Sequence, residues 1–240
     1  MKKWLFAMFV CAAPVLSAQE KEEVKVVDLK YISYDRFSTS GLLNPFHVRV
    51  SGSGQTLILA GPASNVVAAE AFLRKFDVKP RNVEAVFYIV AAGGKAGESS
   101  TMPSELEPVI KQLRHAFAYQ SFRLLETAVV RGRENARFET SGQLPPSKPD
   151  DLKRMYYLST QQVSISPGEK GNTIRFDRLQ FRLSSPDYVV MNVTKKAEYI
   201  NASVNADIDV REGQKVVVGK SSLEAAEGTF FVIVTAKVVD

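Results

Sequence analysis

Hydrophobic and polar residues form their clearest pattern over residues 56–92, where two apolar runs flank an amphipathic segment. The first run is short and ends at Gly61-Pro62, and the second covers residues 83–92. A Lys-Pro-Arg-Asn sequence at residues 79–82 precedes the second run. Because glycine and proline interrupt regular structure, this pattern predicts a strand, a helix and a second strand.

The amphipathic segment predicts a helix that begins at Pro62, since proline at the first helical position loses no hydrogen bond. Glu70 and Arg74 lie four residues apart and predict an ion pair on the polar side of this helix. Pro80 requires the helix to have ended. The apolar residues recur at helical spacing and predict one buried face, made of Val66, Ala69, Leu73 and Phe76.

Residues 83–92 predict a strand that is buried on most of both faces, because apolar side chains occupy both sets of alternating positions. One face carries Val83, Ala85, Phe87, Ile89 and Ala91, and the other carries Glu84, Val86, Tyr88 and Val90.

The residues before this stretch predict further strands. Residues 24–33 alternate as a strand, with Val24, Val26, Leu29 and Ile32 as its main apolar positions. Residues 34–45 predict a short helix or a turn. Residues 46–51 and 56–60 flank a Gly-Ser-Gly-Gln sequence, which predicts a hairpin.

Beyond residue 92 the pattern changes to one helix followed by strands. The glycine-rich residues 93–102 predict a linker, and Pro103 begins a helix with Leu106, Ile110, Leu113 and Phe117 as its apolar stripe. After this helix, apolar residues alternate with a period of two, which predicts strands. One hairpin joins the strands at 122–131 and 136–142, and another joins those at 156–166 and 173–183. These strands are expected at residues 122–131, 136–142, 156–166, 173–183, 200–211, 214–218 and 229–239.

The predicted fold class is therefore α+β, with a small N-terminal α/β module followed by a β-rich domain that has one helix at its start. We assign residues 1–18 to a signal peptide, 19–82 to the module and 83–240 to the β-rich domain. Residues 1–18 have the layout of a secretory signal, because a basic start precedes a short apolar core and small residues up to Ala18.

The charge of the chain is mild. Its 31 Lys+Arg and 26 Asp+Glu give a net charge of +5, and cleavage near Ala18 removes Lys2 and Lys3. The balance argues against a nucleic-acid partner. The single cysteine, Cys11, lies inside the predicted signal and follows Val10 rather than a small residue, so we expect neither lipidation nor a disulfide. No stretch of the mature chain predicts a membrane-spanning helix.

Candidate chemistry is sparse. Residues 213–221 resemble a phosphate-binding loop, but Gly213 and Gly219 are one residue too far apart, and the segment predicts a hairpin that turns at Glu212-Gly213. Three carboxylates lie close together in the sequence near the end of a predicted strand, as a calcium site or an acid–base pair would require: Asp207, Asp209 and Glu212. Asp207 and Asp209 share one strand face, which favours exposure to solvent.

The two histidines, His47 and His115, show no metal-ligand spacing. Asn192 and Asn201 match the short glycan-acceptor pattern. No nucleophile and base can be paired from the sequence. We therefore expect no catalytic, cofactor-binding or metal-binding residue, no cofactor, and a protein that is not an enzyme.

The order of these pieces resembles that of bacterial secretins, the outer-membrane ring channels of secretion and pilus systems. Residues 57–61 are similar to the strand and turn of a periplasmic secretin module, 72–77 to its helix end and 83–92 to its exit strand. Residues 133–145, with Gly142-Gln-Leu-Pro145, are similar to a segment of the secretin β domain, and 211–219 and 231–239 to its last hairpin and closing strand. The chain departs from the family where Gly219-Lys220 replaces paired glycines.

This resemblance implies a shortened secretin-related protein without clear membrane-spanning hairpins. It implies a periplasmic scaffold or accessory subunit of a secretion or pilus-type assembly, which associates with itself or with a secretin-type ring. The alternative is a periplasmic protein that binds a small ligand or peptide, with loops at residues 143–152 and 184–198 as the rim of a groove. Residues 188–206 alternate too poorly to predict strands that cross a membrane.

Overall fold

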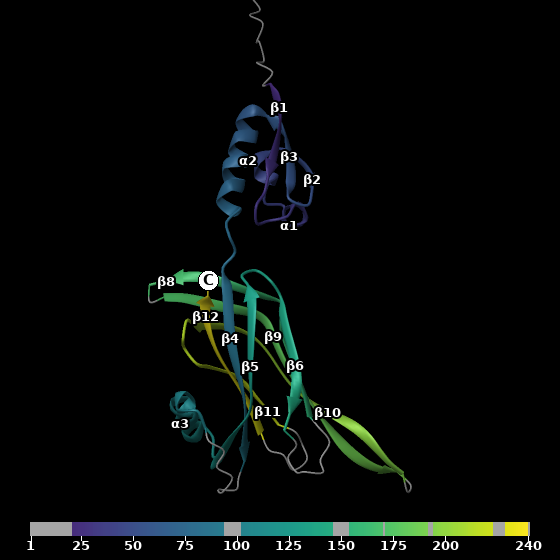
Figure 1. The fold of residues 1–240 in the computed structure, drawn as a ribbon, viewed down its shortest axis with the longest axis vertical. Coiled ribbons are helices and arrows are strands. Elements are labelled where there is room, and N and C mark those ends of the chain that lie inside the picture. Colours follow the sequence, from purple (N-terminus) through teal and green to yellow (C-terminus); the bar gives the residue numbers. More distant parts are fainter. Residues whose placement is uncertain are drawn as a thin grey trace, which may run out of the picture. The chain divides into compact units, whose positions relative to one another are not determined.

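The computed structural model describes residues 21–93, 102–145, 154–169, 171–191, 194–222 and 229–239 (Figure 1). The predicted signal peptide, most of the predicted linker at 93–102 and the acceptor Asn192 lie outside these residues. The chain divides into two compact units, one up to Lys79 and one from Pro80 onward.

The first unit is a three-stranded antiparallel sheet with helices. Strand order is β1-β3-β2, and β2 and β3 form the hairpin that the sequence predicts. The ambiguous residues 34–45 contain a short α-helix and a 3-10 turn. The elements are β1 (Glu22–Asp28), α1 (Tyr34–Ser40), η1 (Asn44–Phe46), β2 (Arg49–Ser53), β3 (Thr56–Pro62) and α2 (Ala63–Phe76).

The core of the first unit lies between β3 and α2. Leu57 and Leu59 of β3 are fully buried, and so are Val66, Ala69 and Leu73 of α2, as the helical spacing predicts. Phe76, which we expected on the same face, is instead 42% exposed. It is the last residue of the helix, and its ring packs on Phe72 at 4.4 Å between centroids rather than entering the core.

The second unit consists of two packed sheets. One has the strand order β11-β12-β4-β5, and the other has the order β10-β9-β7-β6 with β8 paired to β9. The elements are β4 (Asn82–Gly93), η2 (Ser104–Leu106), α3 (Glu107–Ala116), β5 (Ser121–Arg133), β6 (Phe138–Leu144), β7 (Arg154–Thr160), β8 (Gln162–Gly168), β9 (Gly171–Met191), β10 (Thr194–Arg211), β11 (Val216–Ser222) and β12 (Thr229–Val239).

Strand β4 has two buried faces, as its sequence predicts. Phe87 and Ile89 lie in the core between the two sheets, whereas Tyr88 and Val90 face the other way. That second face is covered by α3 and the residues around it, including Leu113. Figure 1 shows α3 beside the β4–β12 sheet. The fold class is therefore α+β, as expected.

Two predicted hairpins in the second unit are wrong. Strand β5 pairs with β4, whereas β6 pairs with β7, so the turn after Arg133 carries the chain from one sheet to the other. The hairpin predicted to turn at Glu212-Gly213 is also not formed, because β10 pairs with β9 and β11 pairs with β12. A turn sequence specifies that the chain reverses, but the hydrogen bonds of each strand depend on distant partners that the turn does not encode.

The predicted strand 156–166 is two strands. Regular pairing stops at Gln161, and β7 and β8 then pair with different parts of β9. The hairpin between β8 and β9 is confirmed.

The predicted loop at 184–198 is also wrong, because residues 184–191 belong to β9 and residues 194–198 to β10. The two strands pair from Thr173↔Arg211 to Met191↔Thr194. A hairpin of this kind is held by backbone hydrogen bonds, which need no alternation of apolar side chains. No α-helix in the part of the chain that the structure describes is long and apolar enough to span a membrane.

Candidate interaction surfaces

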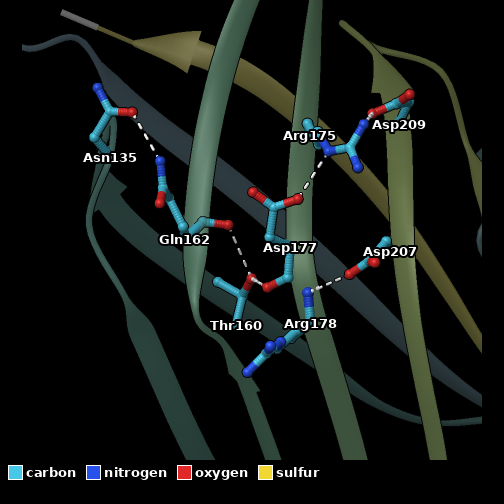
Figure 2. Close-up of polar contacts among 8 residues, drawn as sticks. All are labelled: Asn135, Thr160, Gln162, Arg175, Asp177, Arg178, Asp207 and Asp209. Atoms are coloured by element: carbon cyan, nitrogen blue, oxygen red, sulfur yellow. Dashed lines mark hydrogen bonds and ion pairs between the residues drawn. The ribbon is translucent and has the colours of Figure 1, made fainter. Parts of the chain in front are cut away.

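The three carboxylates singled out in the sequence do not form one site. Asp207 accepts a hydrogen bond from the backbone N–H of Arg178 at 2.6 Å, and Asp209 lies 3.9 Å from the guanidinium of Arg175 (Figure 2). Glu212 accepts hydrogen bonds from the Asn172 side chain and the backbone N–H of Val238. Each carboxylate has a separate structural partner, and no cluster of three potential metal ligands occurs among the described residues.

Residues 213–221, which resemble a phosphate-binding loop, form a turn followed by strand β11. The backbone N–H of Gly213 donates to Ala236 at 2.9 Å, and Gly219 and its neighbours pair with β12. A phosphate loop needs several N–H groups that point at one ligand, whereas here they bond to the protein itself.

The histidines lie in unrelated places. His47, expected in a strand, lies between η1 and β2 with a positive φ of 49°, and its N–H closes the turn on Asn44. His115 is exposed in the last turn of α3.

Polar contacts gather at a bend in the five-stranded sheet (Figure 2). The Thr160 hydroxyl lies within hydrogen-bonding distance of the carbonyl oxygens of Gln162 and Asp177. Arg178 has a left-handed φ of 49°, and the register between β9 and β10 shifts at Asp207. A bulge increases local twist and bends a strand, so these two irregularities together turn the sheet.

An open depression of about 690 Å³ lies at this bend. Two of its charged side chains have partners in the protein: Arg137 pairs with Glu139, and the Asp207 carboxylate accepts the backbone N–H of Arg178. The hydrogen bond that Arg137 donates to the Tyr157 hydroxyl, together with the charge of Glu139, raises the pKa of Arg137. The lining residues are Arg137, Ser159, Thr160, Gln161, Arg178, Gln180, Asn205, Ala206 and Asp207. The contacts of Arg137 and Asp207 join neighbouring parts of the sheet, so they stabilise the bend.

The first unit carries an apolar surface on the outer face of its sheet. Val24 and Val26 of β1 are 67% and 60% exposed, and they stand opposite Ala60 and Ile58 of β3. Side chains alternate along β1, so the intervening Lys25 points to the opposite face, where it reaches α2. We call Val24, Val26, Ile58 and Ala60 the sheet patch.

A second apolar surface lies beside α2. The rings of Phe46, Phe72 and Phe76 pack in a row, with centroid distances of 5.1 Å and 4.4 Å. Phe76 is exposed, whereas Phe46 and Phe72 are partly buried. We call the three phenylalanines the aromatic patch.

Ion pairs fix α2 to the sheet from the side opposite the sheet patch. Glu70 binds the Lys25 ammonium of β1 at 2.5 Å and the Arg74 guanidinium at 2.8 Å. The predicted Glu70–Arg74 ion pair is therefore confirmed, and Glu70 forms a second ion pair with Lys25 of strand β1. The hydrogen bonds from Lys25 and then Arg74 lower the pKa of the Glu70 carboxyl.

Sequence reasoning missed the sheet patch. The positions of Val24 and Val26 predict a strand, but they do not show that no described element covers the face they share. The charged Lys25 on the alternate face was the available signal, because it places a polar residue on the side that packs against the helix.

The fold is similar to that of solved secretins. The competence pilus secretin PilQ of V. cholerae aligns with a TM-score of 0.54 and 12% identity, over 92% of this chain and 79% of that chain. The type II secretin GspD of enteropathogenic Escherichia coli aligns with a TM-score of 0.52 and 13% identity, over 90% and 87% of the two chains. GspD of E. coli K12 aligns with a TM-score of 0.53 and 12% identity, over 92% and 63%.

No model of a protein family matches the chain, and no curated protein sequence matches it. The structural likeness extends over both units, as the order of sequence motifs predicts. The protein therefore has a secretin-like fold.

Proposed function

We propose that this chain is a non-enzymatic protein of the periplasm that acts through protein–protein contacts, as a scaffold or accessory subunit of a secretion or pilus-type assembly. The observation that carries the proposal is the secretin-like fold over about nine-tenths of the chain. The module at residues 19–82 supplies the contacts, and the β-rich domain at 83–240 supplies a rigid body. Residues 1–18 direct export and are cleaved near Ala18.

The two apolar patches of the first unit support self-association. Exposed apolar surface on a small unit is a typical feature of an interaction site. The sheet patch and the aromatic patch are different surfaces, so a contact between one patch and the other patch of a second copy is head-to-tail. Such contacts repeat from copy to copy and close into a ring when the rotation between copies permits it.

Size-exclusion chromatography with light scattering, applied to residues 19–240, tests this proposal. We expect oligomers that dissociate when Val24 and Val26 are both replaced by lysine, since a charge in an apolar contact is costly. Val129→Lys serves as the control, because Val129 is a 58%-exposed strand valine in the second unit. A strict monomer at all concentrations, which also captures no protein from an envelope extract, contradicts the proposal.

A further inference from the structure

The open depression of about 690 Å³ at the bend of the five-stranded sheet has an almost wholly polar lining. Among the described residues that line it, Ala206 alone is apolar, and the others carry carboxamides, hydroxyls or charges. Its volume lies within the range of about 300–1,000 Å³ that small-ligand sites occupy. Most such sites are lined by apolar side chains, so a polar lining narrows the class of ligand that fits.

One row of polar side chains crosses the depression from strand to strand. Ser159 of β7 stands opposite Gln180 of β9, and Gln180 stands opposite Asn205 of β10. Directly opposite residues share one face of a sheet, and all three line the depression. Within the described part of the chain, the side chains of Gln180 and Asn205 form no hydrogen bond. Each carboxamide can therefore both donate and accept hydrogen bonds to a ligand.

The outward positions of β10 carry residues that form strands poorly. Asn201, Ser203, Asn205 and Asp207 alternate along the strand and are all exposed. Asn and Asp are depleted in strands, whereas threonine is polar and enriched there, so a face that only meets water has a better choice. Asp207 supports the bend, but Asn205 does not. Residues that oppose local structural preference in this way are typical of functional sites.

The charges around the depression cancel. Arg137 pairs with Glu139, and the lining residues Arg178 and Asp207 carry opposite charges. The sum over these four side chains is zero. The depression therefore complements a neutral ligand better than an anion or a cation.

An aromatic ring lies beside the depression. Tyr157 precedes Ser159 by two residues on β7, so both side chains lie on the same face of the sheet. The Tyr157 hydroxyl accepts a hydrogen bond from Arg137 at 3.3 Å and donates one to Glu139 at 2.9 Å. These two contacts fix the partly exposed ring, which offers an apolar surface next to the carboxamides.

We infer that this depression binds a neutral oligosaccharide. Each sugar hydroxyl both donates and accepts hydrogen bonds, which matches the carboxamides of Gln180 and Asn205. The apolar face of a pyranose ring packs on an aromatic ring, which Tyr157 supplies. An extended peptide requires pockets for its alternate side chains, and the polar lining offers no apolar one. The inference goes beyond self-association, because both apolar patches belong to the first unit.

Saturation-transfer NMR tests it with the mature protein and three neutral probes: cellotetraose, maltotetraose and chitotetraose. We expect at least one probe to bind. The double variant Gln180→Ala with Asn205→Ala is expected to weaken that binding about tenfold, because two hydrogen bonds between neutral groups are lost. Gln112→Ala is the control, since it removes an exposed carboxamide from α3 and leaves the affinity unchanged.

Amide chemical shifts locate the bound probe. We expect changes around Ser159, Gln180 and Asn205, and we expect Tyr157→Leu, which removes the ring, to weaken binding more than Tyr157→Phe, which keeps it. Absence of binding by all three probes, shift changes elsewhere, unchanged affinity of the double variant, or equal affinity of the two Tyr157 variants overturns the inference. Light scattering of the double variant reports separately on self-association, since neither carboxamide lies in an apolar patch.

Discussion

Single carboxylates connect distant parts of the first unit. Asp77, directly after α2, accepts hydrogen bonds from the backbone N–H groups of Lys30, Tyr31 and Ile32 at 2.7, 2.8 and 3.2 Å. Glu70, two turns earlier, binds Lys25 of β1. Glu70 and Asp77 thus hold strand β1 and the loop after it against α2.

The Glu70 network predicts a pH dependence of stability. Because Lys25 and Arg74 hold the pKa of Glu70 below its ordinary value of 4.5, the unfolded chain binds this proton more readily than the folded one. The stabilisation is therefore fully present above about pH 4.5 and is lost as the pH falls through the lowered pKa. In Glu70→Gln we expect reduced stability at neutral pH and a smaller loss on acidification.

Urea unfolding of the first unit at neutral pH and at low pH measures this difference. Glu23→Gln is the matched control, because Glu23 lies in the same strand pair as Lys25 but forms no ion pair among the described residues. Parallel pH profiles for the wild-type protein and Glu70→Gln contradict the assignment.

At the scale of elements, a glycine explains how β6 and β7 pack. Gly142 stands directly opposite Tyr156, and a Cβ atom at this glycine would lie 2.6 Å from the tyrosine ring. Tyr156 is buried, so its ring cannot move into solvent without losing core contacts. Gly142 is therefore required by close approach, since its φ is not in the left-handed region.

Gly142→Ala is expected to destabilise the second unit by about 1–3 kcal/mol, because the added methyl overpacks a filled site. Tyr156→Leu removes the ring that the new methyl group would meet. Adding Gly142→Ala to Tyr156→Leu is therefore expected to cost less stability than Gly142→Ala costs in the wild-type protein. Denaturant unfolding of the four proteins measures the coupling. If the two substitutions are additive, the close approach has no energetic consequence.

The residues on each side of the boundary between the two units form hydrogen bonds within their own unit. Asp77 binds the first unit, and Arg81 binds Glu134 of the second through two hydrogen bonds of 3.1 and 3.0 Å and the carbonyl of Ile165 at 3.1 Å. The hydrogen bond to Glu134 raises the pKa of Arg81.

At the scale of the whole molecule, the two units have separate hydrophobic cores. The core of the first unit contains Leu73, and the core between the two sheets of the second contains Phe176. Both side chains are fully buried. Because chains with separate cores need not unfold in one step, we expect two unfolding transitions.

Leu73→Ala is expected to destabilise one transition by about 2–5 kcal/mol, and Phe176→Ala the other by about 3–5 kcal/mol. Calorimetry with hydrogen exchange assigns each transition to its unit. A single transition that both substitutions shift equally would show that the units unfold together.

Local sequence determined the elements that have strong punctuation and a single period. Pro62 and Pro80 bracket α2, and the two-sided apolar pattern of residues 83–92 specified the buried strand β4. These signals lie within one element, because helix caps and strand alternation depend on neighbouring residues. The order of such elements also sufficed to predict the secretin-like fold.

Only the tertiary structure decided the pairing of strands and the exposure of surfaces. The turn after Arg133 could equally close a hairpin or cross between sheets, and the crossing occurs because β5 finds β4 and β6 finds β7. Val24 and Val26 alternate like core residues, yet no described element covers their face. Glu70 and Asp77 likewise bond Lys25 and the backbone of Lys30, which lie more than forty positions earlier, through contacts that no local pattern encodes.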